Sequence, residues 1–187
     1  MMINVYIYET VNLAEVELPE NLSEHCNKYT LAHSRMVSRY AYSKLVRILK
    51  DASYNPNLIT FTKEGKPVHP QISFSISHSK DYVVIALSEK SVGCDVEGIF
   101  LDERLKMAPK ILTAEELEIF DHKLDQNGYL TEKWTLKEAY AKYLGTGLIE
   151  RVFKTTVEGF SINVKGAVVS IYPRDTIKMY YENREIR

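Results

Sequence analysis

The stretch from residue 82 to residue 97, YVVIALSEKSVGCDVE, decides the fold. Its first seven residues are an apolar run that predicts a buried strand, and VGCDVE predicts a second strand. The intervening SEKS, residues 88–91, predicts a turn that joins the two strands in a hairpin. Strand side chains alternate between faces, so Asp95 and Glu97, two residues apart, are expected on one face. The chain therefore places two negative charges side by side at the end of a strand.

Two neighbouring carboxylates repel each other unless a cation or a proton lies between them. Mg²⁺ accepts one or two protein carboxylates together with phosphate oxygens of a substrate. Asp95 and Glu97 are therefore candidate metal ligands. The alternative interpretation of an Asp-x-Glu pattern alone is a solvated strand end, and at this point it stays open.

Outward from this stretch, helical and strand patterns alternate along the chain. Helices are expected from Thr30 to Asp51, from Thr113, and from Thr131 to Leu144. Further strands are expected at INVYIY (3–8), LITF (58–61), ISFSIS (72–77), VFKTTVEGFSINV (152–164), AVVSIYP (167–173) and TIKMYYE (176–182). The order of helix followed by strands occurs twice, which indicates an α+β fold with an N-terminal half, 1–97, and a C-terminal half, 98–187.

Composition limits the classes of function. The chain has 187 residues, with 24 Lys and Arg against 25 Asp and Glu, so no overall basic charge indicates a nucleic-acid partner. The two cysteines form no C-x-x-C pair, and the five histidines show no zinc spacing. No apolar run approaches the roughly 18 residues of a membrane span. We therefore expect a cytoplasmic protein without a membrane partner.

A second motif, KWTLKEAYAKYLGTGL at residues 133–148, has helical spacing. Trp134, Glu138 and Lys142 are each four residues apart and so share one helix face. Glu138 and Lys142 alone fit an exposed ion pair, and Trp134 alone fits a core position. The other interpretation is a third carboxylate directed at the same metal, with Lys137 and Lys142 available for phosphate.

Two shorter stretches carry further candidates. In FSISHS, residues 74–79, Ser77 and His78 follow an apolar strand, and His78 has the chemistry to donate a hydrogen bond to a phosphate. No G-x-S-x-G motif accompanies them. In KEGKP, residues 63–67, the lysines are either solvated turn residues or contacts to a nucleotide phosphate.

The order GKP, FSISHS, GCDVE and WTLKEAYAKYLGTGL resembles the 4′-phosphopantetheinyl transferases, specifically the surfactin-synthetase-activating type. The match extends from about Lys63 to Leu148. The resemblance implies two similar α/β halves related by a pseudo-twofold axis, with the active site in the cleft between them. It also implies a monomer.

The resemblance further implies a holo-[acyl-carrier-protein] synthase reaction. The 4′-phosphopantetheine group of coenzyme A would pass to a serine of an apo acyl or peptidyl carrier protein, with release of adenosine 3′,5′-bisphosphate. The family pattern assigns Mg²⁺ to Asp95, Glu97 and Glu138, with Glu138 as the proton acceptor. The residues implied to contact coenzyme A or to assist the reaction are Arg35, Lys66, Ser77, His78, Lys137 and Lys142.

Two assignments keep alternatives. Glu116 is either a family residue that assists catalysis or the partner of Thr113 in a capping box. The segment 98–107, GIFLDERLKM, is either a docking site for a carrier helix through residues such as Phe100 or part of the local core. Two rival functions also remain: a non-catalytic module that binds coenzyme A or a carrier, and a metal-dependent phosphodiesterase.

Overall fold

The computed structural model describes residues 2–11, 13, 17–79 and 81–186 and shows a mixed α+β fold. The helices are α1 (Glu20–Asn27), α2 (Ala32–Asp51), α3 (Ala108–Ile111), α4 (Ala114–Asp121), α5 (Gln126–Leu144) and α6 (Glu150–Phe153). The strands are β1 (Met2–Glu9), β2 (Thr60–Phe61), β3 (Pro67–Val68), β4 (Ser73–His78), β5 (Tyr82–Ser88), β6 (Gly93–Gly98), β7 (Phe160–Val164), β8 (Ala167–Tyr172), β9 (Thr176–Tyr181) and β10 (Arg184–Ile186). Two 3-10 turns cover Pro56–Leu58 and Asp102–Met107.

The strands form one large and two small sheets. The large sheet has the order β10-β9-β1-β5-β4, in which β1 and β9 are parallel and the other neighbours are antiparallel. The order β6-β8-β7 forms an antiparallel three-stranded sheet, and β2 pairs with β3. Strand β6, which carries Asp95 and Glu97, therefore belongs to a different sheet from β5.

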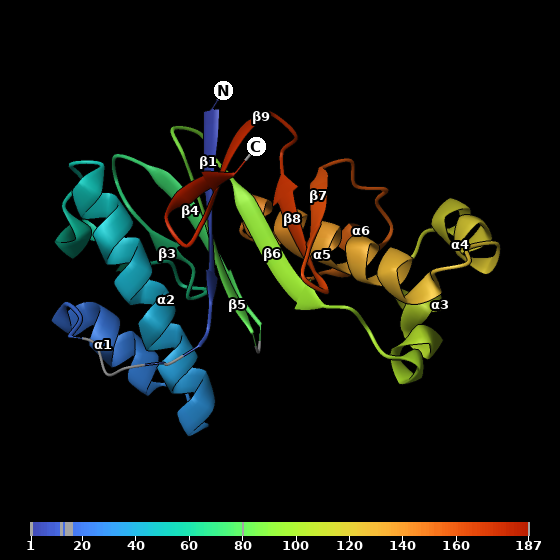
Figure 1. Cartoon of the computed structure of the whole chain (residues 1–187), viewed down its shortest axis with the longest axis horizontal. Coiled ribbons are helices and arrows are strands. Elements are labelled where there is room, and N and C mark those ends of the chain that lie inside the picture. Colours follow the sequence, from blue (N-terminus) through green and yellow to red (C-terminus); the bar gives the residue numbers. More distant parts are fainter. Residues whose placement is uncertain (1, 12, 14–16, 80, 187) are drawn as a thin grey trace.

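The hairpin expected at residues 82–97 is wrong. Both edges of β5 are hydrogen-bonded, to β1 on one side and to β4 on the other. No edge of β5 is left for β6, so the chain crosses to the second sheet and pairs β6 with β8. Figure 1 shows β6 running obliquely at the edge of the three-stranded sheet that lies toward β5.

Several expected helix limits hold and others shift. The capping box at Thr113 and Glu116 is present, and α5 ends at Gly145, which has a positive φ of 73°. However, α5 begins five residues before the expected Thr131, because Asp125 caps its N-terminus through the Gly128 N–H. The Lys165–Gly166 turn between β7 and β8 has positive φ at both residues, as a tight hairpin requires.

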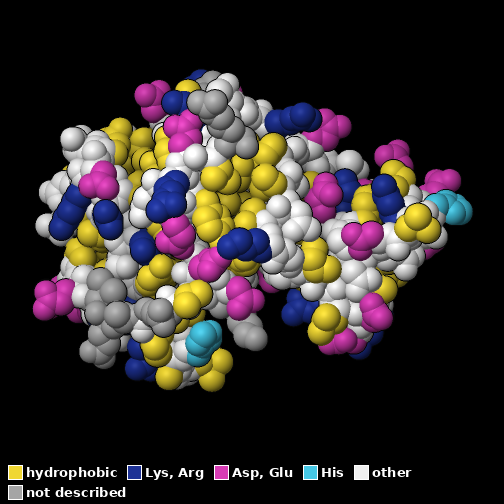
Figure 2. All heavy atoms as spheres, in the orientation of Figure 1, with side chains coloured by type: hydrophobic (Ala, Val, Ile, Leu, Met, Phe, Trp, Pro, Cys, Tyr) yellow, Lys and Arg dark blue, Asp and Glu magenta, His cyan; other side chains and the backbone are white. Residues whose placement is uncertain are grey.

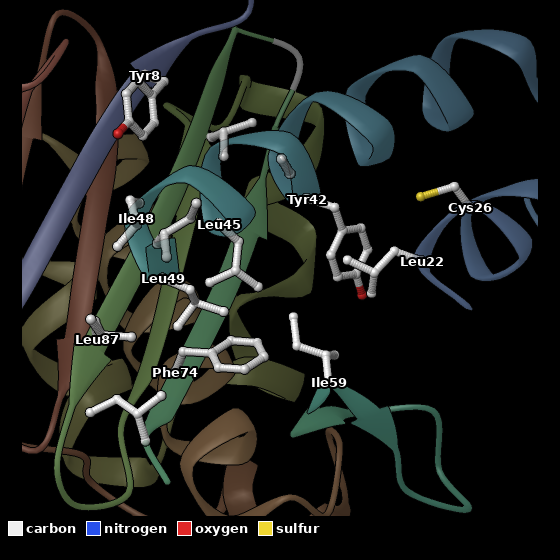
Figure 3. Packing of buried hydrophobic residues seen from close by; sticks show 14 of the residues in the cluster. Tyr8, Leu22, Cys26, Tyr42, Leu45, Ile48, Leu49, Ile59, Phe74 and Leu87 are labelled. Carbon is white, nitrogen blue, oxygen red and sulfur yellow. The ribbon is translucent and has the colours of Figure 1, made fainter. Parts of the chain in front are cut away.

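Helices and sheets stack in layers (Figure 1). Helices α1 and α2 cover one face of the five-stranded sheet, and the three-stranded sheet with α5 lies on its other side. Figure 3 shows the first core, in which Leu45 and Leu49 of α2 lie against Phe74 and Leu87 of the sheet. A second core lies between the two sheets and contains Val5, Val84, Val96 and Val169 among others.

Strand pairing crosses the expected boundary at residue 97 in both directions. Strand β1 of the first half pairs with β9 of the second, and β6 pairs with β8. A third core, formed by α3, α4 and α5, lies at one end of the molecule around Phe100, Phe120 and Leu130. The pseudo-twofold relation between halves stays a prediction.

The surface is chemically mixed. Lys and Arg side chains alternate with Asp and Glu side chains across the face in Figure 2, in keeping with the near-zero net charge. Among the described residues, no helix combines the length and the apolar character needed to cross a membrane.

Candidate active site

The site begins where β4 and β6 lie side by side. Asp95 is only 4% exposed, and its Oδ1 accepts a hydrogen bond of 2.6 Å from the Ser77 hydroxyl. The backbone N–H of Cys94 donates to the Ser75 hydroxyl at 3.0 Å, which fixes β6 against β4. Ser75 and Ser77 are two residues apart and so point to the same face of β4. Alternating serines in an otherwise apolar strand therefore hold the acidic strand in place.

Helix α5 brings the second group of site residues to Asp95. The Lys142 ammonium donates to Asp95 Oδ1 at 2.7 Å and to the Ser77 hydroxyl at 2.8 Å. Glu138 lies one helical turn earlier on the same face. The close approach of α5 to β6 depends on Gly93, because a Cβ there would overlap the carbonyl oxygen of Ala139. Three elements, β4, β6 and α5, thus meet at one buried carboxylate.

The site is electrostatically crowded. Burial and then the negative charge of Asp95 raise the pKa of Glu138 to about 7. The same two causes raise the pKa of Glu97. Burial lowers the pKa of Lys142, but Asp95, Cys94 and Glu138 together more than offset this, so the pKa is raised overall. The three carboxylates together lack sufficient positive charge, which is the condition that a bound cation relieves.

One carboxylate oxygen at the site has the chemistry to bind such a cation. Asp95 Oδ2 is buried and has no hydrogen-bond partner among the described residues. Carboxylate oxygens are the ligands that Mg²⁺ prefers. Within the described part of the chain, however, no three acidic, histidine or cysteine side chains already converge around one point. The donor types fit Mg²⁺, and Lys142 is the cation that contacts Asp95 directly.

A cavity of about 320 Å³ opens beside these residues. It lies between the turn that joins β2 to β3 and the C-terminal end of α5, and its lining includes Lys66, Glu138, Lys142 and Thr146. A second hollow of about 300 Å³ is lined by Glu97 and Leu101, among others. Glu138 faces the first hollow and Glu97 faces the second, with Asp95 between α5 and β4.

Some of the predicted contact residues line the cavity, and others are engaged in contacts elsewhere in the chain. Lys66 lines the cavity, and its ammonium donates to the backbone carbonyl of Lys142 at 2.5 Å. His78 ends β4, and burial followed by the charge of Lys142 lowers its pKa, which favours the neutral imidazole. Ser77 is 6% exposed and is engaged with Asp95 and Lys142. Arg35 donates twice to the carbonyl of Tyr29, at 3.0 and 3.2 Å.

Lys137 lies away from the cavity, contrary to the expectation that it contacts coenzyme A. Its side chain is 0% exposed, and its ammonium contacts Glu116 Oε2 at 2.8 Å. The same ammonium donates to the carbonyls of Phe153 and Thr155. All three donors of a lysine ammonium are thereby occupied. The helical period explains the error, because Lys137 is turned by about 100° from Glu138.

Two open alternatives are also decided by contacts. Glu116 is 3% exposed and accepts from the Thr113 N–H at 3.0 Å, so the capping-box interpretation holds. Phe100 is 4% exposed and packs near Trp134, so it belongs to the local core and is not free to dock a partner. Leu101, the next residue, is 65% exposed.

Sequence reasoning missed two features of the site. Glu64 and Thr146 line the cavity, although neither was among the expected contact residues. His33, near the start of α2, is close enough to His78 to contribute to the lowering of its pKa. No spacing rule in the sequence signals that α2 and β4 meet there.

Comparison with known proteins finds similarity to one family of enzymes. A sequence profile described as the 4′-phosphopantetheinyl transferase superfamily matches residues 91–176. The chain is 37% identical over 99 residues to 4′-phosphopantetheinyl transferase gsp of Aneurinibacillus migulanus, which covers 50% of this chain and 41% of the relative. It is 32% identical over 113 residues to 4′-phosphopantetheinyl transferase ffp of Bacillus subtilis, which covers 56% and 50%.

A Haemophilus influenzae relative named for the same activity is 29% identical over 150 residues, or 74% of this chain and 64% of the relative. The aligned part of the chain thus covers less than two thirds of each relative's own length.

Proposed function

We propose that the chain is a member of the 4′-phosphopantetheinyl transferase superfamily, whose profile matches residues 91–176, and that it transfers the 4′-phosphopantetheine group of coenzyme A to a serine of an apo carrier protein. The observation that carries the proposal is the meeting of Asp95, Glu138 and Lys142 beside a cavity lined by a further lysine. The carrier is an acyl or peptidyl carrier protein. Adenosine 3′,5′-bisphosphate is the second product.

The transfer exchanges one phosphorus–oxygen bond for another. The serine hydroxyl oxygen bonds to the phosphorus that carries pantetheine, and the bond from that phosphorus to the adenosine bisphosphate oxygen breaks. The serine proton goes to Glu138, directly or through a water, and the leaving group departs as an anion. Such a reaction depends mainly on positioning and on neutralisation of charge.

The acidic residues suit Mg²⁺ as the companion of this reaction. Asp95, Glu97 and Glu138 would hold the ion together with pyrophosphate oxygens of coenzyme A, and the free Asp95 Oδ2 supports this assignment. When bound, the ion would neutralise the pyrophosphate and polarise the phosphorus under attack. Burial and the charge of Asp95 raise the pKa of Glu138 to about 7 in the metal-free chain, and a bound cation would offset this crowding of negative charge.

The basic residues have separate tasks in this proposal. Lys142 lies at the cavity wall, where it balances charge on the pyrophosphate and on the leaving group. Lys66 and His78 bind phosphate groups of coenzyme A, with Lys66 exchanging its contact to the Lys142 carbonyl for a phosphate oxygen. Arg35 is the weakest of the inferred contacts, because its guanidinium already serves the Tyr29 carbonyl.

The two hollows suggest separate approaches for the two substrates. Coenzyme A occupies the hollow lined by Lys66 and Lys142, and the carrier serine enters from the side of Glu97 and Leu101. Exposed Leu101 thus replaces Phe100 as the residue that meets the carrier. A pseudo-twofold relation between the halves, a monomeric state and a cytoplasmic location belong to the same proposal.

The deciding experiment mixes the purified chain with a purified apo carrier protein, coenzyme A and Mg²⁺, and weighs the carrier by mass spectrometry. We expect a phosphopantetheine-sized gain that falls about 10²–10⁴-fold in rate in Glu138→Gln. Glu150→Gln, at an exposed ion pair on α6, is the matched control and is expected to act like the wild type.

Two other results would contradict the proposal. Bound coenzyme A with no gain on acyl or peptidyl carriers would favour a binding module. Hydrolysis of a phosphodiester in the absence of a carrier would favour a phosphodiesterase.

A further inference from the structure

A buried ion pair lies directly behind the proposed site. Lys137 of α5 is fully buried, and Glu116 of α4 is 3% exposed, with 2.8 Å between ammonium and carboxylate oxygen. Lys133 lies 3.8 Å from the other oxygen of Glu116. The pair joins α5 to α4, and the two carbonyls at Phe153 and Thr155 join it to the end of α6.

The pair is difficult to explain by stability alone. Removing two charges from water is costly, and apolar side chains of similar volume often replace a buried pair without loss of stability. In some proteins a buried polar or charged group instead fixes one geometry of the fold. The question is which geometry this pair fixes.

The helical period gives the answer. Thr135 and Ala139 share one face of α5 and contact the three-stranded sheet, Thr135 through a 2.6 Å hydrogen bond to Ser170 and Ala139 through its close approach to Gly93. Lys137 is about 200° from Thr135 and so lies on the opposite face. Glu138 lies between these faces, next to the cavity. The contacts of Thr135 and Ala139 with the three-stranded sheet hold one face of α5, and the ion pair of Lys137 holds the opposite face.

We propose that Glu116 and Lys137 are positioning residues that fix the rotation of α5 and thereby direct Glu138 toward Asp95 and the cavity. This inference rests on the proposed function. Neither residue touches a substrate, because the ammonium of Lys137 is fully occupied and Glu116 is engaged with Lys137 and the Thr113 N–H. Both act through Glu138, the neighbour of Lys137 in the chain.

Two variants test the pair. Glu116→Asp keeps both charges and shortens the link by one methylene, so α5 must rotate or the contact must lengthen. Lys137→Met combined with Glu116→Gln removes both charges, keeps an acceptor for the Thr113 N–H and leaves no buried charge unpaired. The matched control is Lys154→Met with Glu150→Gln, which removes an ion pair that is exposed on α6.

Two readouts separate positioning from stability. The first is the steady-state transfer rate, as kcat and as KM for coenzyme A. The second is the affinity for Mn²⁺ measured by electron paramagnetic resonance without substrate. A misplacement of about 1 Å can cost about 10²-fold in rate, so at saturating Mg²⁺ we expect kcat to fall about 10- to 100-fold in both variants with KM for coenzyme A unchanged. Mn²⁺ affinity should fall in parallel, and the control should match the wild type.

The inference is overturned if a folded variant keeps wild-type kcat and Mn²⁺ affinity. If the double variant fails to fold, Glu116→Asp decides, because it retains the charged pair. A wild-type chain that transfers nothing would overturn the proposed function, and the Mn²⁺ measurements would then decide this inference alone. The inference also fails if the variants lose activity only in proportion to the fraction unfolded.

Discussion

At the scale of single residues, Gly93 sets how closely α5 approaches the strand with the acidic pair. In Gly93→Ala, the added Cβ would overlap the Ala139 carbonyl oxygen and lie 2.7 Å from the Tyr143 nitrogen, both of them backbone atoms that cannot move independently. We expect a loss of about 1–3 kcal/mol in the free energy of unfolding, measured by urea denaturation. Gly98→Ala is the control in the same strand, since a Cβ there would meet no atom of the described residues within 4 Å. Equal stability of the two variants would contradict the close packing of α5 on β6.

Glu138 gives a second prediction at this scale, on the dependence of stability on pH. Its pKa is about 7 in the folded chain against an ordinary 4.5, so the folded state binds the proton more tightly than the unfolded state. Stability contributed by this group is therefore lost as pH rises from about 4.5 to about 7 and is constant above that. In EDTA, Glu138→Gln should remove this loss.

The measurement is thermal melting at pH 5 and pH 8 with EDTA present. The free energy of unfolding should differ less between pH 5 and pH 8 in Glu138→Gln than in the wild type, by on the order of 1–2 kcal/mol. This figure allows for solvent screening of a partly exposed group. Mg²⁺ should also reduce the difference in the wild type. A pH dependence identical in both proteins would contradict a pKa of Glu138 raised by burial and by Asp95.

At the scale of elements, the segment 98–107 separates a structural residue from a candidate contact residue. Phe100 is buried beside Trp134 and lies in the third core, so Phe100→Ala should cost about 3–5 kcal/mol of stability. Leu101 is exposed at the second hollow, so Leu101→Ala should leave stability nearly unchanged and raise KM for the carrier alone. Carrier titrations at saturating coenzyme A measure this. An unchanged carrier KM in Leu101→Ala would exclude this side as the carrier approach.

The elements also show how far sequence patterns reach. Local chemistry identified the capping box at Thr113 and the end of the long helix at Leu144 correctly, because each depends on a few adjacent residues. The partner of β6 could not be read locally. It depends on β1 and β4 occupying both edges of β5, and β1 is more than seventy residues away in the chain.

The site shows the same division. Asp95, Glu138 and Lys142 were found from spacing on one strand and one helix, and the structure brings them together. Lys137 was misplaced because a basic residue beside Glu138 fits either a phosphate or a buried carboxylate. Only the position of α4, and so of Glu116, distinguishes these, and nothing within the helix itself encodes that position.

At the scale of the whole molecule, strand pairing makes the two halves interdependent. Met179 of β9 is 8% exposed, is aligned with Val5 of β1 and belongs to the core between the sheets. Trp134, the single tryptophan, reports instead on the third core at the other side of α5. If the two sheets and the third core unfold cooperatively, β9 and the region around Trp134 unfold in one transition.

Met179→Ala tests this coupling. The lost core contacts should cost about 2–5 kcal/mol, and in a chain of this size each kcal/mol lowers Tm by about 2–4 °C. We expect the far-UV circular dichroism signal and Trp134 fluorescence to shift together, because β1, β9, β6 and β8 share one packed core. A Trp134 transition that stays at the wild-type temperature while circular dichroism shifts would mean that the halves unfold independently. In that case residue 97 would mark a true boundary, and the site on α5 would tolerate damage to the five-stranded sheet.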